Sequence, residues 1–99
     1  MNRREFDALA LKATDDVFAF AQFAQQSEDA FVGSTDAVGL ERYQRAWLEV
    51  EIVNAVALED WENEGRPASW DDTWRELYQP SAAEAVVVLK AAAVGLMAK

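Results

Sequence analysis

The side chains in this sequence that could carry chemistry are carboxylates and aromatic rings, because the 99 residues include no histidine and no cysteine. The densest run of carboxylates lies between Glu49 and Glu76, where nine acidic residues accompany only Arg66 and Arg75 and the net charge is −7, out of −9 for the chain. Such a segment projects a negative potential that attracts basic partners. The candidate partner-binding residues are Glu59, Asp60, Glu62, Glu64, Trp70, Asp71 and Asp72. The alternative interpretation is that these acids only keep the protein in solution.

Aromatic residues concentrate in the same part of the chain: Tyr43, Trp47, Trp61, Trp70, Trp74 and Tyr78. Tryptophan and tyrosine are enriched among the residues that dominate binding energy at interfaces, so these rings could line a pocket or anchor a partner. The alternative is the corner of a small core, in which the rings after residue 69 pack against the helix that ends near residue 63.

The residue types that are missing exclude most familiar catalytic and metal sites. Without cysteine or histidine there is no thiolate nucleophile, no imidazole base and no zinc site of the usual kind. Glu59, Glu62 and Asn63 lie within one helical turn, but their spacing matches no known calcium-binding loop. We therefore expect no enzyme, no metal and no cofactor, while a carboxylate pair in an aromatic pocket is the remaining enzymatic alternative. Direct nucleic-acid binding is disfavoured because the sequence has no basic patch.

Apolar periodicity predicts an amphipathic helix over about Arg3–Gln26, followed by a loop that includes Gly33, Ser34 and Thr35. The predicted buried stripe of this helix consists of Phe6, Ala10, Ala13, Val17, Phe20 and Ala24.

A second helix is predicted from about Asp36 or Leu40 to Asn63, closed by Gly65. Its main stripe consists of Leu40, Tyr43, Trp47, Val50, Asn54, Ala57 and Trp61. Leu48, Ile52 and Val56 form a second row that faces away from the first. We predict an oligomer interface from this row together with Asn54, which in a paired helix would set the register. Alternatively, Asn54 bonds a buried backbone carbonyl near a helix end. Which of the two apolar rows is buried stays open.

A short third helix is predicted from the cap residue Ser69 to about Tyr78, with Trp70, Trp74 and Leu77 on its buried face and a stop at Gln79-Pro80. The segment from Ser81 to Glu84 has the form of a capping box. It predicts a fourth helix to Met97 that is apolar nearly all round except for Lys90, as in a helix wrapped by its neighbours.

These elements predict a single all-α domain over residues 1–99, an elongated four-helix bundle with two long helices, one short helix and one apolar C-terminal helix. At 1.5 Å per residue the two long helices would each measure about 36 Å, and the third and fourth together would match one long rod. Three layers leave the second helix with an uncovered face, so we expect a homodimer.

Function is predicted only as a class. We expect a small acidic protein-interaction module that binds a basic protein, as bacterial antitoxins, immunity proteins and phage-encoded inhibitors do; the alternative is a structural subunit that acts through helical homo-oligomerisation. Glu5 and Asp7 directly follow the basic start and spoil a secretory signal, and the apolar stretch Ala82–Ala98 is only seventeen residues long and contains Glu84 and Lys90. We therefore expect a cytoplasmic protein with no membrane partner.

Overall fold

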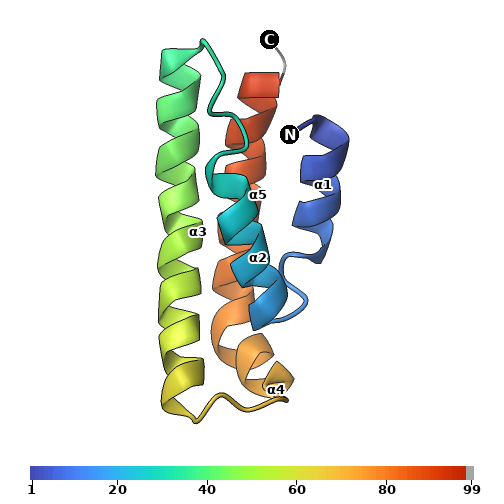
Figure 1. Cartoon of the computed structure of the whole chain (residues 1–99), viewed down its shortest axis with the longest axis vertical. Helices are drawn as coiled ribbons and strands as arrows, with labels where there is room; N and C mark the ends of the chain where they lie inside the picture. Colours follow the sequence, from blue (N-terminus) through green and yellow to red (C-terminus); the bar gives the residue numbers. More distant parts are fainter. Residues whose placement is uncertain (98–99) are drawn as a thin grey trace.

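The computed structural model describes residues 1–97, and helices are the only regular elements in that range. They are α1 (Arg3–Lys12), α2 (Val17–Glu28), α3 (Ala37–Asn63), α4 (Asp71–Thr73), the π-helical turn η1 (Trp74–Tyr78) and α5 (Gln79–Met97). The prediction of an all-α chain is confirmed. In Figure 1 α1 runs downward, α2 upward, α3 downward and α5 upward along one long axis. The molecule is elongated, with extents of 44 × 21 × 19 Å.

The predicted continuous helix over Arg3–Gln26 is wrong, because the chain turns back between α1 and α2. Asp16 is the N-cap of α2, and its carboxylate accepts a hydrogen bond of 2.7 Å from the backbone N–H of Ala19. The Thr14 carbonyl at this turn accepts hydrogen bonds from Trp74 Nε1 (2.9 Å) and Gln79 Nε2 (2.8 Å). The predicted apolar stripe is nevertheless buried along its whole length, since α1 and α2 both pack against the same core.

Helix α3 closely matches its prediction. Its N-cap is Asp36, whose carboxylate accepts a hydrogen bond of 3.0 Å from the Gly39 N–H, and the chain leaves the helix through Gly65 at a φ of 88°. The main stripe faces the core: Tyr43, Val50, Asn54 and Ala57 are buried and the rest are half-buried. Leu48, Ile52 and Val56 are 54%, 56% and 51% exposed. The second apolar row of the sequence therefore lies on the outer, solvent-facing side of α3.

Side-chain donors of α3 fix it to the end of α2. The Tyr43 hydroxyl donates a hydrogen bond of 2.6 Å to the carbonyl of Ser27, and Trp47 Nε1 donates one of 2.9 Å to the carbonyl of Ala24. The Ser27 carbonyl also accepts a bond of 3.4 Å from the Ala30 N–H, and the Ala24 carbonyl accepts one of 3.4 Å from the Ser27 hydroxyl, so the donors of α3 give each carbonyl a shorter second bond.

The predicted stop at Gln79-Pro80 is wrong, because α4, η1 and α5 form one continuous rod. Proline lacks an N–H, and its ring crowds the carbonyl four residues earlier. The chain accommodates Pro80 by widening the preceding turn, in which the Gln79 N–H bonds the carbonyl of Trp74, five residues back. The widened turn places Tyr78 against the core and leaves Leu77 61% exposed, contrary to its predicted burial.

The start of this rod also differs from the prediction. The residue at the N-cap is Trp70 rather than Ser69, and it makes no side-chain capping bond. The segment from Ser81 to Glu84 lies inside α5, so it does not cap a new helix.

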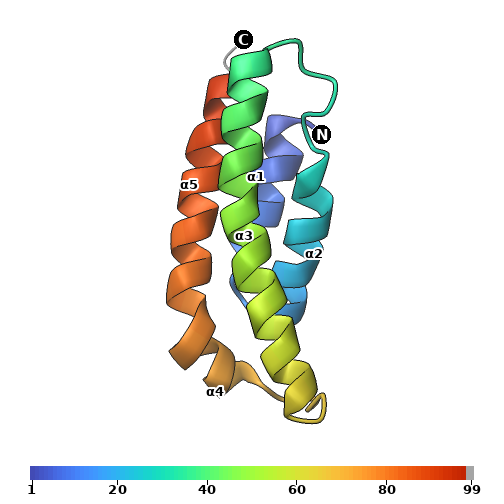
Figure 2. The same cartoon turned by 90° about the vertical axis from the view of Figure 1, so that its left-hand side faces the viewer.

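Helix α5 is buried on one side only, so the prediction that its neighbours wrap it is wrong. Ala82, Leu89 and Ala93 are fully buried, whereas Val87, Val88 and Val94 are exposed. Figure 2 shows α5 side by side with α3, with which it makes the most extensive contact in the fold. The outer surface of this pair is consequently rich in aliphatic side chains.

Asn54 lies among the core residues of α3, so its predicted place in an oligomer interface is wrong. The side chain is 8% exposed, and within residues 1–97 no donor or other partner bonds its buried Oδ1. Asn54 lies on the opposite side of α3 from Ile52.

Replacing Asn54 with leucine should stabilise the fold. Leaving a buried acceptor without a hydrogen bond costs about 1–3 kcal/mol, and an apolar group of similar size removes that cost. We expect the free energy of unfolding, measured by urea titration, to rise by about 1–3 kcal/mol. Asn54→Ala, which removes the amide but leaves a cavity, is the control. A leucine variant less stable than the wild type would contradict the burial of an unbonded amide.

Candidate protein-interaction surfaces

The acidic residues from Glu59 to Glu76 lie at one end of the molecule, where α3 ends and α4 begins (lower part of Figure 1). Three hydrogen bonds organise this end. Trp61 Nε1 donates to the carbonyl of Pro67 (2.9 Å), Trp70 Nε1 donates to Glu64 Oε2 (2.7 Å), and the Tyr78 hydroxyl donates to Asp60 Oδ2 (2.7 Å). Asp60 and Glu64, both predicted to contact a partner, are thus acceptors that hold the turn and η1 against α3.

The aromatic rings at this end are packing residues. Tyr78 stacks on Trp70 with ring centroids 5.7 Å apart and on Trp74 at 6.3 Å, and Phe18 of α2 meets Trp61 edge-on at 5.1 Å. Trp70 is only 6% exposed, so its predicted role as a partner anchor is wrong and the core-corner alternative describes it. These contacts join α2, α3 and η1.

The contacts of Tyr78 raise the pKa of its hydroxyl from 10.0 to about 12, mainly through burial and then through the hydrogen bond to Asp60 and the charges of Asp60 and Glu64. Burial also raises the pKa of Tyr43. The folded protein therefore holds the Tyr78 proton more tightly than the unfolded chain does. This contribution to stability is complete below pH 10 and is lost as the pH rises through about 12.

Spectrophotometric titration should show this retention directly, because the chain has only two tyrosines. We expect little tyrosinate absorbance at 295 nm from the folded protein at pH 10 to 11, and half-ionisation near pH 10 in denaturant. A folded protein that ionises a full tyrosine equivalent near pH 10 would contradict the Tyr78–Asp60 contact. Tyr78→Phe identifies which tyrosine is responsible.

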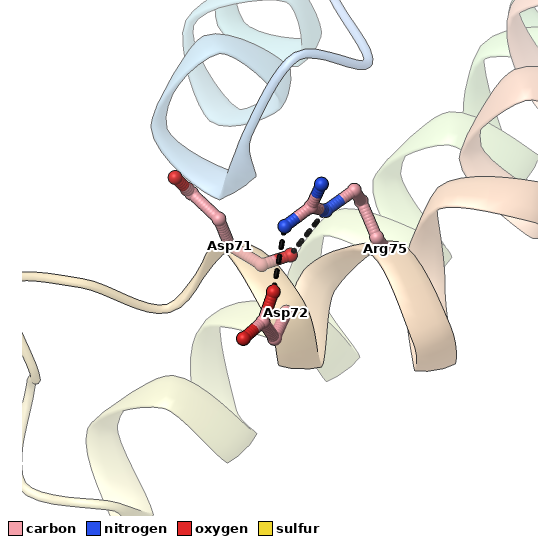
Figure 3. Close-up of polar contacts among 3 residues, drawn as sticks. All are labelled: Asp71, Asp72 and Arg75. Carbon is pink, nitrogen blue, oxygen red and sulfur yellow. Dashed lines mark hydrogen bonds and ion pairs between the residues drawn. The ribbon is translucent and has the colours of Figure 1, made fainter.

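The other predicted acids lie on the surface. Arg75 Nη2 bonds Asp72 Oδ1 at 2.6 Å, and its Nε donates to the backbone carbonyl of Asp71 at 3.3 Å, while the Asp71 carboxylate points away from Arg75 (Figure 3). Glu62 lies 3.8 Å from Arg66, and Glu59 is exposed. The seven predicted residues thus share one end of the molecule: Glu59, Glu62, Glu64, Asp71 and Asp72 are exposed, Asp60 is half-buried and Trp70 is buried.

These carboxylates do not converge on a metal. Within the described part of the chain, no three acidic side chains come close enough together to hold an ion. Glu59, Glu62 and Asn63 are all exposed near the end of α3.

The second candidate surface is the outer face of α3, which carries the aliphatic row formed by Leu48, Ile52 and Val56, called here the outer row. Arg45 precedes the row and bonds Glu41 at 2.7 Å, an ion pair in which both side chains are largely exposed. Beside the row, Arg42, Arg45 and Glu49 of α3 line a shallow groove together with Val88 of α5. An aliphatic strip with charged ends therefore runs along the α3–α5 side of the molecule.

A third feature is an open groove of about 580 Å³ between α1 and α2, with Leu9 and Phe23 among its apolar lining and Lys12, Asp15 and Asp16 among its polar lining. The sequence does not predict this groove, because the apolar spacing of α1 and α2 fits one continuous helix. The Asp15-Asp16 pair, which offers a helix cap, was the available signal.

No protein-family model, curated protein or solved structure matches the chain. No helix within residues 1–97 combines the length and apolar character needed to cross a membrane.

Proposed function

We propose that this chain is a non-catalytic protein-interaction module that acts as an assembly subunit, pairing with a second copy of itself through the outer row. The observation that carries the proposal is that three large aliphatic side chains, spaced four residues apart on one face of α3, are each more than half exposed although the core is complete without them. Contiguous exposed aliphatic surface of this kind is characteristic of interaction sites.

The energetics favour a dimer whose strength depends on its flanking contacts. Fully burying a large aliphatic side chain contributes about 1.5–3 kcal/mol, so covering the exposed halves of six such side chains in a twofold interface contributes about 6 kcal/mol. Association costs roughly 4–15 kcal/mol in lost freedom. The outer row alone would therefore support only weak pairing, and the neighbouring charges and the exposed valines of α5 must contribute the rest.

Sedimentation equilibrium from micromolar to near-millimolar concentration tests this proposal. The expected result is a mass that rises with concentration from 11.0 kDa towards twice that value, or that is already twice 11.0 kDa throughout. A mass of one chain over the whole range would refute pairing.

A second candidate function is binding of a basic protein at the acidic end, as in antitoxins or immunity proteins. It is favoured by the exposed carboxylates of Asp71 and Glu76, which add to the negative potential of a segment with a net charge of −7. An arginine-rich peptide is a suitable probe, titrated at low and high salt. Binding should weaken steeply with salt.

Two variants that lose the same charge separate local binding from general attraction. The first neutralises the acidic end and the second neutralises three acids elsewhere: Asp71→Asn/Asp72→Asn/Glu76→Gln and Glu5→Gln/Asp7→Asn/Glu84→Gln. If the acidic end is the site, the first variant loses most of its affinity and the second keeps it. Equal losses would reject this candidate.

A further inference from the structure

The residues on the outer face of α3 are arranged symmetrically about Ile52. Leu48 and Val56 lie four residues before and after it, and Arg45 and Glu59 lie seven residues before and after it. The pattern is symmetric in its aliphatic positions and opposite in charge at its two ends. All five side chains are exposed.

Resting on the proposed pairing, we propose that two copies associate antiparallel along α3, with the twofold axis at Ile52. This arrangement places Leu48 against the partner's Val56 and Ile52 against the partner's Ile52. It also brings Arg45 to the partner's Glu59. A twofold interface uses the same patch on both chains, so each of these contacts occurs twice, except that of Ile52 with its own copy, which lies on the axis.

Charge distribution favours this direction over a parallel one. Seven of the nine acids in the segment with a net charge of −7, those from Glu59 to Glu76, lie at the end of the molecule where α3 finishes, whereas Glu49 and Glu51 lie near the middle of α3. Antiparallel pairing with the axis at Ile52 separates the two acidic ends of α3 by about 33 Å, twice the rise from Ile52 to Asn63. This separation is several times the screening length of about 8 Å at physiological salt. Parallel pairing would place the acidic ends side by side and would set Arg45 against Arg45.

The charged side chains are available for exchange between chains. Arg45 bonds Glu41 in an exposed pair, and pairs of this kind contribute about 0–1 kcal/mol, so a change of partner costs little. Glu59, the counterpart of Arg45 in the proposed pair, is exposed. Matched charges that flank an apolar seam fix orientation and register in paired helices.

Single cysteines test the register, because the chain has none of its own. Three variants, Ile52→Cys, Leu48→Cys and Val56→Cys, are each oxidised alone. A mixture of Leu48→Cys and Val56→Cys is also oxidised. We expect Ile52→Cys to form disulfide-linked dimers and the mixture to link Leu48→Cys to Val56→Cys. Leu48→Cys alone and Val56→Cys alone should each form disulfides at least roughly tenfold more slowly than Ile52→Cys. In the antiparallel pair the two copies of either position are about 12 Å apart along the helix axis, whereas a disulfide needs its two Cβ atoms about 4 Å apart.

The outcomes separate this inference from the proposed function. Efficient self-linking of Leu48→Cys would indicate parallel pairing and overturn the register while leaving the dimer. A dimeric mass without any of the expected links would also overturn the register. A monomeric mass for the wild type would refute both.

Charge reversal gives an independent readout that does not depend on disulfide geometry. Arg45→Glu should weaken the dimer at least roughly tenfold, because two attractive contacts become repulsive. The double variant Arg45→Glu/Glu59→Arg restores both attractions and should recover affinity to within about threefold. Failure of the double variant to recover would overturn the inference, since in a parallel dimer neither residue faces the other.

Discussion

Replacing Ile52 with glutamate should leave the protein monomeric at every concentration at which the wild type is dimeric. The substitution places two carboxylates together on the twofold axis, and an unpaired charge buried in an interface costs about 3–5 kcal/mol. This corresponds to a loss of affinity of at least about a hundredfold, since 1.4 kcal/mol is tenfold. The fold should be unaffected, because Ile52 is a solvent-facing residue in the single chain. Sedimentation and circular dichroism measure the two effects separately.

Leu11→Glu is the matched control for this experiment. Leu11 is an exposed aliphatic residue on α1, on the far side of the molecule from α3 (Figure 1), and the substitution makes the same change in charge. It should leave the dimer intact. Equal weakening by Leu11→Glu would show that total charge, rather than the outer row, governs association.

Replacing Trp74 with alanine should have the largest effect on folding. The indole is fully buried, packs against Phe20 at a centroid distance of 5.5 Å and donates through Nε1 to the Thr14 carbonyl. Truncating a buried tryptophan costs about 3–5 kcal/mol, and domains have total stabilities of about 5–15 kcal/mol. We expect the urea midpoint to fall by a third or more of its wild-type value, or the variant not to fold.

Leu77→Ala is the control that tests the widened turn. A uniform α-helical turn would leave Leu77 on the buried face with Trp74, as the sequence predicts, whereas the π turn exposes it. Its truncation should therefore cost less than about 0.5 kcal/mol. A loss comparable with that of Trp74→Ala would contradict the π-helical register.

Periodicity predicted what each helix buries better than where each helix ends. The stripe from Phe6 to Ala24 is buried as expected, because an apolar face must be covered whether its helix is whole or broken. The break at Thr14–Asp16 was missed for the same reason: two helices that fold back on one core can share the same spacing of apolar residues. The contacts that fix the break come from Trp74 and Gln79, at least 60 residues along the chain.

Pro80 is a second place where a local sequence rule predicted the wrong helix boundary. The rule that a residue before proline leaves helical geometry describes an ordinary helix. Here the preceding turn widens, and packing of Trp70, Trp74 and Tyr78 against the core accompanies this change. That packing depends on tertiary contacts that a local pattern does not contain.

The two candidate surfaces also differ in how far the sequence could predict them. The aliphatic outer row was readable because it follows from helical geometry alone. The roles of the acids could not be predicted, because Asp60 and Glu64 are acids like their neighbours. What distinguishes them is that they accept hydrogen bonds from Tyr78 and Trp70, respectively. Composition gives the net charge of this segment, but it does not show which carboxylates accept hydrogen bonds within the fold.

Ile52 offers the most direct test of whether a second copy covers the outer row, because it is the only isoleucine in the chain. Selective labelling of its δ1-methyl group gives a single NMR signal, whose broadening by a dissolved paramagnetic agent reports exposure. Strong broadening in dilute solution that falls with rising protein concentration, while labelled Leu11 stays fully sensitive, is the result that this account predicts. An Ile52 methyl group equally accessible at all concentrations up to near-millimolar would contradict it.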